Sequence, residues 1–292
     1  MYCIRGSNGG AGVAADVTKI VAAPGAPDSL TARLVQQAGF DATYMTGFGA
    51  TSVRLGTPDL GLLTLTEMAD HARNMVRAVD IPVIADADTG YGGPLNISRT
   101  VEEYLQAGVA ALHLEDQVAP KRCGQLAGIR LTPADEAALR LKAAVTARGR
   151  NDLLIIGRTD ALPVAGINEA ADRAKRYQDA GIDLAFVDGV KTCAEVEAIA
   201  TQVTGPKVVS LVDGTDAATL TREDLQDMGF DIVLYAVTAL FAQAHAGAEA
   251  LAALKSAGRP EFSQATMGYE DFCQAVDLIG HQEFAGMFET SR

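Results

Sequence analysis

Eight short apolar runs, each followed by a polar or glycine-rich turn, recur along most of this chain. They lie at 19–25, 42–47, 82–88, 111–116, 153–160, 184–189, 207–213 and 231–236. Their hydrophobicity is continuous rather than alternating, which is typical of parallel strands that are covered on both faces. The sequence therefore predicts eight buried parallel strands.

Segments with helical periodicity separate these runs. They lie at 28–38, 66–79, 98–107, 133–148, 168–180, 193–202, 222–228 and 239–257. Four of them end in a glycine that precedes the next strand, at Gly39, Gly108, Gly181 and Gly229. Because glycine accepts the left-handed conformation, it lets a helix stop and the chain reverse. Eight β–α units without a linker-like segment predict one (β/α)8 TIM-type barrel domain over residues 1–292, with a doubly wound open sheet as the alternative.

The two ends of the chain lack this alternation. Residues 1–16 are rich in glycine and alanine, and we expect a flexible N-terminal segment there. Residues 259–292 form a C-terminal tail with one further helix predicted at 269–279. We expect the apolar face of that helix to pack on a neighbouring subunit.

Charge and cysteine content narrow the classes of partner. The net charge of −13 argues against nucleic acid and anionic membrane surfaces as partners. No run approaches the roughly 18 apolar residues of a membrane helix, and residues 1–16 lack the apolar stretch of a signal peptide. The four cysteines are scattered without a C-x-x-C pair, which is typical of reduced thiols. We therefore expect a cytoplasmic protein.

Carboxylates follow two neighbouring predicted strands. Asp86 and Asp88 end one apolar run, and Glu115 ends the next. If the first pair lies on a strand, residues two apart point the same way, toward the barrel mouth. Such an anionic cluster favours Mg²⁺ or Mn²⁺, because a divalent cation relieves the repulsion between carboxylates. The alternative for Asp86 and Asp88 alone is ordinary turn chemistry before a glycine.

A cysteine lies in a basic loop shortly after the second acidic strand end. Cys123 follows Lys121 and Arg122 and precedes Gly124. Cationic neighbours lower the pKa of a thiol, so we expect an acid–base group in a loop able to close over a site. The alternative is an inert cysteine, as most isolated cysteines are.

Two other strand ends carry candidate binding groups. Arg158 ends an apolar strand. It either pairs with Asp160 or Asp188, or it binds a substrate carboxylate bidentately. The run Thr46-Gly-Phe-Gly49 offers backbone N–H groups to an anion. His113 lies within an apolar strand, and we interpret it as a hydrogen-bonded core histidine.

In these motifs the chain resembles the isocitrate lyase/phosphoenolpyruvate mutase superfamily, and most of all its 2-methylisocitrate lyase branch. The resemblance extends from about Lys19 to Phe284. It is carried by Ala23-Pro-Gly-Ala26, Tyr44-Met-Thr-Gly47, Pro58-Asp-Leu-Gly61, Ala85-Asp-Ala-Asp-Thr-Gly-Tyr-Gly92, Leu114-Glu-Asp-Gln117 and Lys121-Arg-Cys-Gly124. It implies a (β/α)8 barrel whose eighth helix is exchanged between subunits, and hence a homotetramer that is a dimer of dimers.

The resemblance also implies roles for individual residues. Asp86, Asp88 and Glu115 would hold Mg²⁺, with Asp59 in the same acidic network. Substrate-binding positions would include Thr46, Gly47, Phe48 and Arg158 around the 2-oxo-acid part, with Gly124, Gln125, Asp188 and Ser210 toward the other end. Tyr44 would lie near the reacting oxygen, and Lys121 to Gly124 would form the gating loop. Cys123 would protonate the carbanion that C–C cleavage releases, which favours a lyase over a phosphoryl mutase.

Three positions depart from the family pattern. Gln125 replaces the usual histidine, Asp188 the usual glutamate and Ser210 the usual asparagine. We therefore expect a substrate other than plain isocitrate or 2-methylisocitrate.

Three hypotheses remain open from the sequence. The first is a Mg²⁺-dependent C–C lyase that cleaves a small 2-hydroxy di- or tricarboxylate into a 2-oxo acid and a carboxylate. The second is a hydrolase or decarboxylase of oxaloacetate-like 2-oxo acids, for which Cys123 matters less. The third is a non-catalytic metabolite-binding member of the family.

Overall fold

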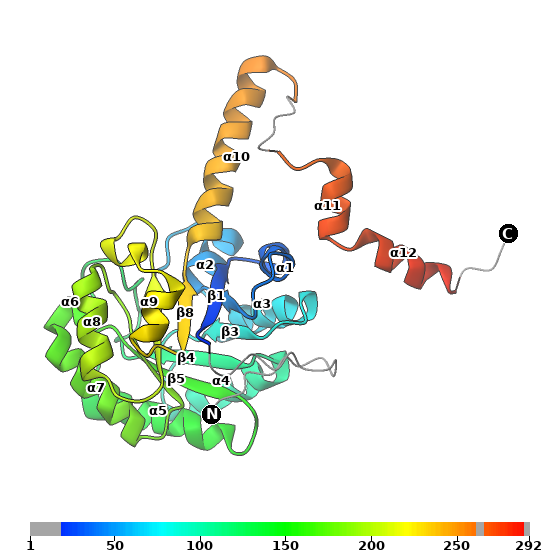
Figure 1. Cartoon of the computed structure of the whole chain (residues 1–292). Helices are drawn as coiled ribbons and strands as arrows, with labels where there is room; N and C mark the ends of the chain where they lie inside the picture. Colours follow the sequence, from blue (N-terminus) through cyan, green and yellow to red (C-terminus); the bar gives the residue numbers. More distant parts are fainter. Residues whose placement is uncertain (1–18, 261–265, 289–292) are drawn as a thin grey trace. The chain divides into compact units, whose positions relative to one another are not determined.

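A closed barrel of eight parallel strands forms the centre of the fold, as Figure 1 shows. The computed structural model describes residues 19–260 and 266–288. The strands are β1 Val21–Ala26, β2 Thr43–Met45, β3 Val83–Asp86, β4 Ala111–Glu115, β5 Leu154–Thr159, β6 Leu184–Val187, β7 Lys207–Leu211 and β8 Ile232–Tyr235. Each pairs with its sequence neighbour, and β8 closes onto β1. The predicted barrel is confirmed and the open sheet is excluded, while the predicted segment 1–16 lies outside the described residues.

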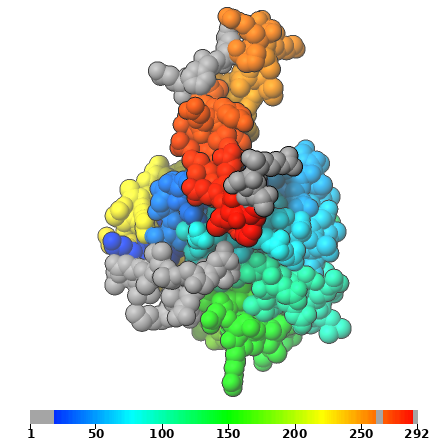
Figure 2. Space-filling view, turned by 90° about the vertical axis from the view of Figure 1, so that its right-hand side faces the viewer, coloured from blue at the N-terminus to red at the C-terminus, as the bar shows by residue number. Residues whose placement is uncertain are grey.

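The predicted helices between the strands are also present. They are α1 Ser29–Gln37, α3 Leu65–Ala78, α4 Pro94–Ala107, α5 Ala134–Arg148, α7 Ile167–Asp179, α8 Cys193–Gln202 and α9 Arg222–Asp227. The four helix-ending glycines named above all have positive φ angles, between 82° and 95°. Helices α3, α4 and α5 pack side by side outside the barrel, and their surfaces follow one another from light blue to green in Figure 2.

Three short helices are additions to the prediction. They are α2 Gly47–Leu55, α6 Leu162–Ala165 and the 3₁₀ helix η1 Asp216–Thr219. Each lies in a connection that follows the C-terminal end of a strand. Of these, α2 begins directly after β2 and therefore helps to shape the barrel mouth.

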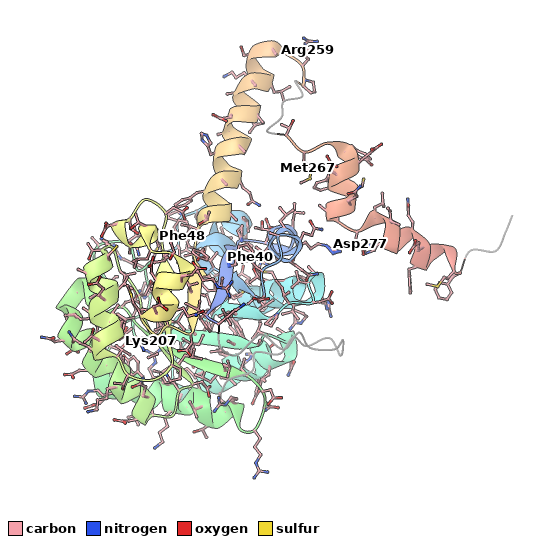
Figure 3. The ribbon with its side chains drawn as sticks, in the orientation of Figure 1. Phe40, Phe48, Lys207, Arg259, Met267 and Asp277 are labelled. Carbon is pink, nitrogen blue, oxygen red and sulfur yellow. The ribbon has the colours of Figure 1, made fainter. Side chains whose placement is uncertain are left out.

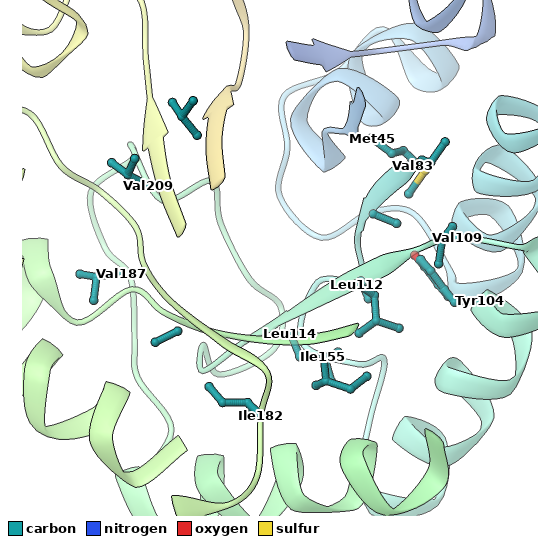
Figure 4. Close-up of a cluster of buried hydrophobic side chains, with 14 of the residues drawn as sticks. Met45, Val83, Tyr104, Val109, Leu112, Leu114, Ile155, Ile182, Val187 and Val209 are labelled. Atoms are coloured by element: carbon teal, nitrogen blue, oxygen red, sulfur yellow. The ribbon is translucent and has the colours of Figure 1, made fainter. Parts of the chain in front are cut away.

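Two apolar layers hold the barrel together. The outer layer lies between strands and helices and includes Leu112, Ile155 and Tyr104, shown in Figure 4. The inner layer fills the barrel and includes Ile84 and Ile156. Because side chains alternate along a strand, the next inward positions after Ile84 and Ile156, which are Asp86 and Arg158, fall at the C-terminal mouth. The fold therefore places the strand-end polar residues together above an apolar floor.

The contacts divide the chain into two units, one up to Thr238 and one from Ala239 onward. The second unit contains nearly all of α10 Thr238–Ala257, together with α11 Tyr269–Ala275 and α12 Leu278–Gly286. The single predicted helix over 269–279 is wrong, because Asp277, labelled in Figure 3, adopts a left-handed φ of 58° and caps α12 through the Gly280 amide. Within the described ranges, none of the helices has the length and apolar character needed to cross a membrane.

Candidate active site

The predicted site residues gather at the C-terminal ends of the strands. Figure 3 labels a residue near each end of the barrel, with Phe48 just after β2 and Lys207 at the start of β7. The strand register pairs Asp86 with His113 on β3 and β4, and Glu115 with Arg158 on β4 and β5. Acidic and basic groups from consecutive strands are thus brought side by side at one mouth, as expected for a TIM-type barrel.

Asp86 is held by backbone donors. Its Oδ2 accepts from the Gly47 amide at 3.2 Å, and its Oδ1 accepts from the Asp88 amide at 2.9 Å. The first of these amides belongs to the N-terminus of α2, where the helix dipole favours a negative charge. Burial alone would raise its pKa, but the neighbouring His113, Lys121 and Arg158 lower the pKa of Asp86 to about 2. Asp86 is therefore ionised.

Asp88 lies in a turn rather than on the strand. β3 ends at Asp86, and Asp88 has a φ of 46°, so the expected same-face alternation does not apply to this pair. Its Oδ1 lies 2.6 Å from the Nζ of Lys121, which also lies 2.7 Å from Asp59 Oδ2. Burial raises the pKa of Asp88 to about 6. In this arrangement Asp59 and Asp88 share the lysine as their counter-charge.

Glu115 is the carboxylate of the described site in which both oxygens lack a hydrogen-bond donor. Both of its carboxylate oxygens are buried and accept no hydrogen bond from the described residues. The Arg158 Nη2 lies 3.4 Å from Glu115 Oε2, at ion-pair distance. Burial raises the pKa of Glu115 well above its usual value. A buried carboxylate without donors from the protein is suited to bind a cation or a ligand.

The carboxylates fit a hard divalent cation by chemistry. Asp86, Asp88 and Glu115 supply oxygen atoms at or just after two consecutive strand ends, and the Glu115 oxygens accept no hydrogen bond from the described residues. No three His, Cys, Asp or Glu side chains among the described residues are arranged to hold a metal ion as they stand. The Lys121 ammonium occupies one face of the cluster instead, through its contact with Asp88.

Arg158 is the hub of the other half of the site. Its Nη2 lies 2.6 Å from Asp188 Oδ2 and 2.9 Å from Asp160 Oδ1. The guanidinium also stacks 5.5 Å from the centroid of the Phe186 ring. Of the two interpretations from the sequence, the structure shows the pairing with both carboxylates, and substrate binding by Arg158 stays a prediction. Burial raises the pKa of Asp188. Because Asp188 contacts the guanidinium directly, a ligand carboxylate and Asp188 would compete for Arg158.

Residues 119–129, here called the thiol loop, lie directly against this hub. The Cys123 amide donates to the Asp59 carbonyl at 3.2 Å. A Cβ on Gly124 would lie 2.6 Å from Asp188 Oδ2 and 2.9 Å from Arg158 Nη2, so only glycine fits there without movement. The loop therefore covers the mouth of the barrel at Arg158.

The Cys123 thiol has the opposite character from the one expected. Arg122 is exposed and donates to the Ala127 carbonyl at 3.4 Å, within the loop. Burial raises the pKa of Cys123 to about 11. The expected lowering is wrong because desolvation outweighs the charge of Arg158, the cation that does act on the thiol. Cys123 is a neutral thiol that carries a proton.

Tyr44 and His113 form a buried pair below this layer. The Tyr44 hydroxyl lies 3.0 Å from His113 Nε2, and the His113 Nδ1 lies 3.7 Å from Asp86 Oδ1. Burial lowers the pKa of His113 to about 4, so the imidazole is neutral. The interpretation of His113 as a hydrogen-bonded core residue is confirmed.

The remaining predicted positions surround the same mouth. Thr46 caps α2 by accepting from the Gly49 amide at 3.4 Å. Ser210 on β7 and Asp188 after β6 are buried, whereas Gln125 and Phe48 are half-buried. Of the backbone amides predicted to bind an anion, that of Gly47 donates to the side chain of Asp86, and that of Gly49 donates to Thr46.

Two groups of this site lie outside the predicted set. Asp160 binds Arg158 through both carboxylate oxygens, at 2.9 and 3.3 Å. Gln117 contacts both Asp160 and the thiol loop. From the sequence, Asp160 was considered only as a partner of Arg158, and Gln117 only as the last residue of the motif Leu114-Glu-Asp-Gln117.

Known proteins share this fold and sequence pattern. The family model for phosphoenolpyruvate phosphomutase matches residues 16–255. The 2,3-dimethylmalate lyase of Eubacterium barkeri is 41% identical over 266 residues, 90% of each chain. The 2-methylisocitrate lyase of Halalkalibacterium halodurans is 37% identical over 268 residues, 88% of each chain.

Solved structures of related enzymes are also similar to this chain in fold and sequence. Oxaloacetate acetylhydrolase in complex with 3,3-difluorooxalacetate has a TM-score of 0.87 and 34% identity, with 94% of each chain covered. Phosphonopyruvate hydrolase in complex with oxalate and Mg²⁺ has a TM-score of 0.84 and 28% identity, covering 94% of this chain and 95% of the other. The expected family and the prediction of an enzyme are confirmed, since these relatives are named as lyases, mutases and hydrolases. The chain belongs to the phosphoenolpyruvate mutase/isocitrate lyase superfamily.

Proposed function

We propose that this protein is a Mg²⁺-dependent C–C lyase that cleaves a small 2-hydroxy di- or tricarboxylate into a 2-oxo acid and a second carboxylate. The observation that carries this proposal is the position of Cys123 in the loop that packs on Arg158, where burial raises the pKa of the thiol. A lyase of this kind creates a carbanion at C3 that needs a proton from a nearby acid. The relative named 2,3-dimethylmalate lyase supports a substrate of this class.

The reaction is a retro-aldol cleavage. The substrate hydroxyl loses its proton, the bond between C2 and C3 breaks, and the oxygen becomes the carbonyl of a 2-oxo acid. The bonding electron pair stays on C3, next to the second carboxylate, and C3 must then receive a proton. Cys123 donates that proton, for which a thiol that stays neutral at physiological pH is suited.

The chain's own residues supply the charge complementarity. Arg158 would bind the 2-oxo-acid carboxylate in exchange for one of its present partners, Asp188 or Asp160. Tyr44, oriented by His113, would lie near the reacting oxygen. A divalent cation held by Asp86, Asp88 and Glu115 would supply positive charge beside the developing oxyanion. Lys121, bound to Asp59 and Asp88, links this acidic cluster to the thiol loop.

The altered positions bear on substrate choice. Asp188 contacts Arg158 directly, and its side chain is one methylene shorter than the glutamate of the family pattern. Gln125 carries no charge where that pattern has a histidine. We therefore propose that the second carboxylate group differs from that of isocitrate or 2-methylisocitrate, and efficient turnover of either acid would contradict this.

The alternative is cleavage of an oxaloacetate-like 2-oxo acid by hydrolysis or decarboxylation. Similarity to the oxaloacetate acetylhydrolase structure favours it. In that chemistry Arg158 would bind the 2-oxo acid, a cation held by the same carboxylates would supply positive charge beside its carbonyl, and we expect Cys123 to matter less.

A panel assay of 2-oxo-acid release with added Mg²⁺ tests the proposal. The panel comprises isocitrate, 2-methylisocitrate, 2,3-dimethylmalate, citramalate and oxaloacetate. Release of pyruvate or glyoxylate from a hydroxy acid, abolished by EDTA and by Cys123→Ala, is the expected result. Turnover of oxaloacetate alone, retained in Cys123→Ala, would establish the alternative instead.

A further inference from the structure

The thiol loop is closed at its base by short antiparallel pairing. The Val118 amide donates to the Arg130 carbonyl at 2.8 Å, and the Thr132 amide donates to the Asp116 carbonyl at 2.8 Å. Gln117 and Leu131 form an isolated bridge between these contacts. The base of the loop is therefore anchored to the end of β4, while its tip needs other contacts to stay over the mouth.

The Gln117 side chain, at the base of the loop, provides such contacts. Its Nε2 donates to the Arg122 carbonyl at 2.7 Å, and its Oε1 accepts from the Arg122 amide at 2.9 Å. Both backbone groups of the residue before Cys123 are thus bound by one amide side chain. Gln117 is only 1% exposed, so these bonds face little competition from water.

The same amide reaches the substrate-binding half of the site. Gln117 Nε2 also donates to Asp160 Oδ2 at 3.2 Å, and Asp160 in turn binds Arg158. The backbone of Asp160 is held in place, because its amide donates to Asp116 Oδ1 at 3.0 Å. Gln117 therefore joins the thiol loop to a rigid group that orients Arg158.

We propose that Gln117 is a positioning residue that fixes the Cys123 thiol relative to Arg158. This inference rests on the proposed lyase function, in which the thiol must reach the carbanion held by Arg158. The geometry requires an amide, since the side chain donates twice and accepts once. Glutamate has nearly the same shape, but it cannot donate to the Arg122 carbonyl and would place a second negative charge beside Asp160.

Three variants separate hydrogen bonding from side-chain volume. Gln117→Ala removes the hydrogen bonds of Gln117 to Arg122 and Asp160, here called the clamp. Gln117→Glu keeps the shape of the side chain, and Gln202→Ala changes an exposed glutamine on α8 as the control. The rate of Cys123 alkylation by iodoacetamide is measured by peptide mapping, which resolves Cys123 from the other cysteines. We expect an increase of about tenfold or more in both Gln117 variants, because the loop opens locally. On a substrate identified by the panel, kcat should fall by roughly 10–100-fold, because the donor is misplaced.

The alkylation result does not depend on turnover, so it distinguishes this inference from the proposed function. If Cys123 is alkylated faster in the Gln117 variants but the wild type shows no lyase activity, the positioning role of Gln117 is supported and the proposed lyase function is wrong. Alkylation of Cys123 at the wild-type rate in folded Gln117→Ala, or wild-type kinetics and alkylation in Gln117→Glu, would overturn the clamp.

A measurement on the unmodified protein guards against variants that fail to fold. The Arg122 amide, although its residue is exposed, should exchange with deuterium at least about tenfold more slowly than an open chain, because Gln117 accepts its hydrogen bond. Exchange at the open-chain rate would contradict the clamp.

Discussion

At the scale of the residue, burial decides the protonation states in this site. Glu115 and Cys123 both have raised pKa values because they are removed from water, whereas the charged neighbours of Asp86 lower its pKa. The sequence could place these residues at strand ends, but it could not report how deeply each would be buried. That is why the expectation for the Cys123 pKa was wrong in sign while its position in the loop was right.

Glu115→Gln should stabilise the metal-free protein while removing its response to metal. A raised carboxyl pKa means that the folded state binds the proton more tightly, so stability falls as pH rises above about 4.3, the value in the unfolded chain. In EDTA near pH 7.5 we expect a higher Tm for the variant. The increase should be about 2–4 °C for each kcal/mol by which the substitution raises the free energy of unfolding. The difference should shrink toward acid pH.

Calorimetry or dye-monitored unfolding, with and without Mg²⁺, checks this expectation. Mg²⁺ should raise the Tm of the wild type but leave that of Glu115→Gln unchanged. Glu136→Gln, on an exposed position of α5, serves as the control. A metal-free variant that is less stable than the wild type at pH 7.5 would contradict the interpretation of Glu115 as an unsatisfied carboxylate.

Cys123→Ala should lower kcat by about 10²–10⁴-fold, the usual contribution of a general acid. In the wild type the rate should show no loss from thiol ionisation below the region of pH 11, because burial raises the pKa of Cys123 to about 11. A pH–rate profile checks both statements, with Cys193→Ala, at the start of α8, as the matched control. A decline that tracks a thiol pKa near 8 would show that the thiol is not buried during turnover.

At the scale of the element, periodicity predicted strands and the longer helices well. Each buried strand is a continuous apolar run, and each helix-ending glycine adopts the positive φ that its position required. Helix α2 was missed because its start, Gly47-Phe-Gly49, is rich in glycine, and the contact that fixes it comes from Asp86, 39 residues away. The position of Asp88 was missed for a related reason, since its left-handed φ ends the alternation of β3.

Gly124→Ala tests how closely the thiol loop packs on Arg158. The added Cβ would lie 2.6 Å from Asp188 Oδ2 and 2.7 Å from Asp160 Oδ1, so the loop must shift outward. We expect kcat/KM to fall by roughly 10–100-fold with little change in Tm, because the loop tip moves and the barrel does not. Gly93→Ala, where an added Cβ meets open space, is the control. Equal kinetics for the two variants would show that the loop does not lie on Arg158 during turnover.

At the scale of the whole molecule, the segment from Ala239 onward exposes an unusual number of large apolar side chains. Tyr269 is 84% exposed, Phe288 74% and Leu251 67%. Concentrations of exposed apolar surface mark interaction sites. The tetramer remains a prediction from the family resemblance, and these side chains are the physical reason to test it.

Sedimentation equilibrium provides that test. We expect a particle of about four times the 30.5 kDa chain mass, and Leu251→Glu with Phe284→Glu should shift it to smaller species. Arg176→Glu, an exposed change on α7, is the control. A monomer at micromolar concentration in the wild type would contradict the predicted assembly.

The most direct measurement is ¹H NMR of the products formed in D₂O from the five acids of the panel with Mg²⁺. C–C lyase chemistry predicts a 2-oxo acid together with a carboxylate that has gained one deuteron at the cleaved carbon. Both products should disappear with EDTA and in Cys123→Ala. Acetate, the partner product of oxalate, or pyruvate, the partner product of carbon dioxide, formed from oxaloacetate alone and undiminished in Cys123→Ala, would contradict the lyase.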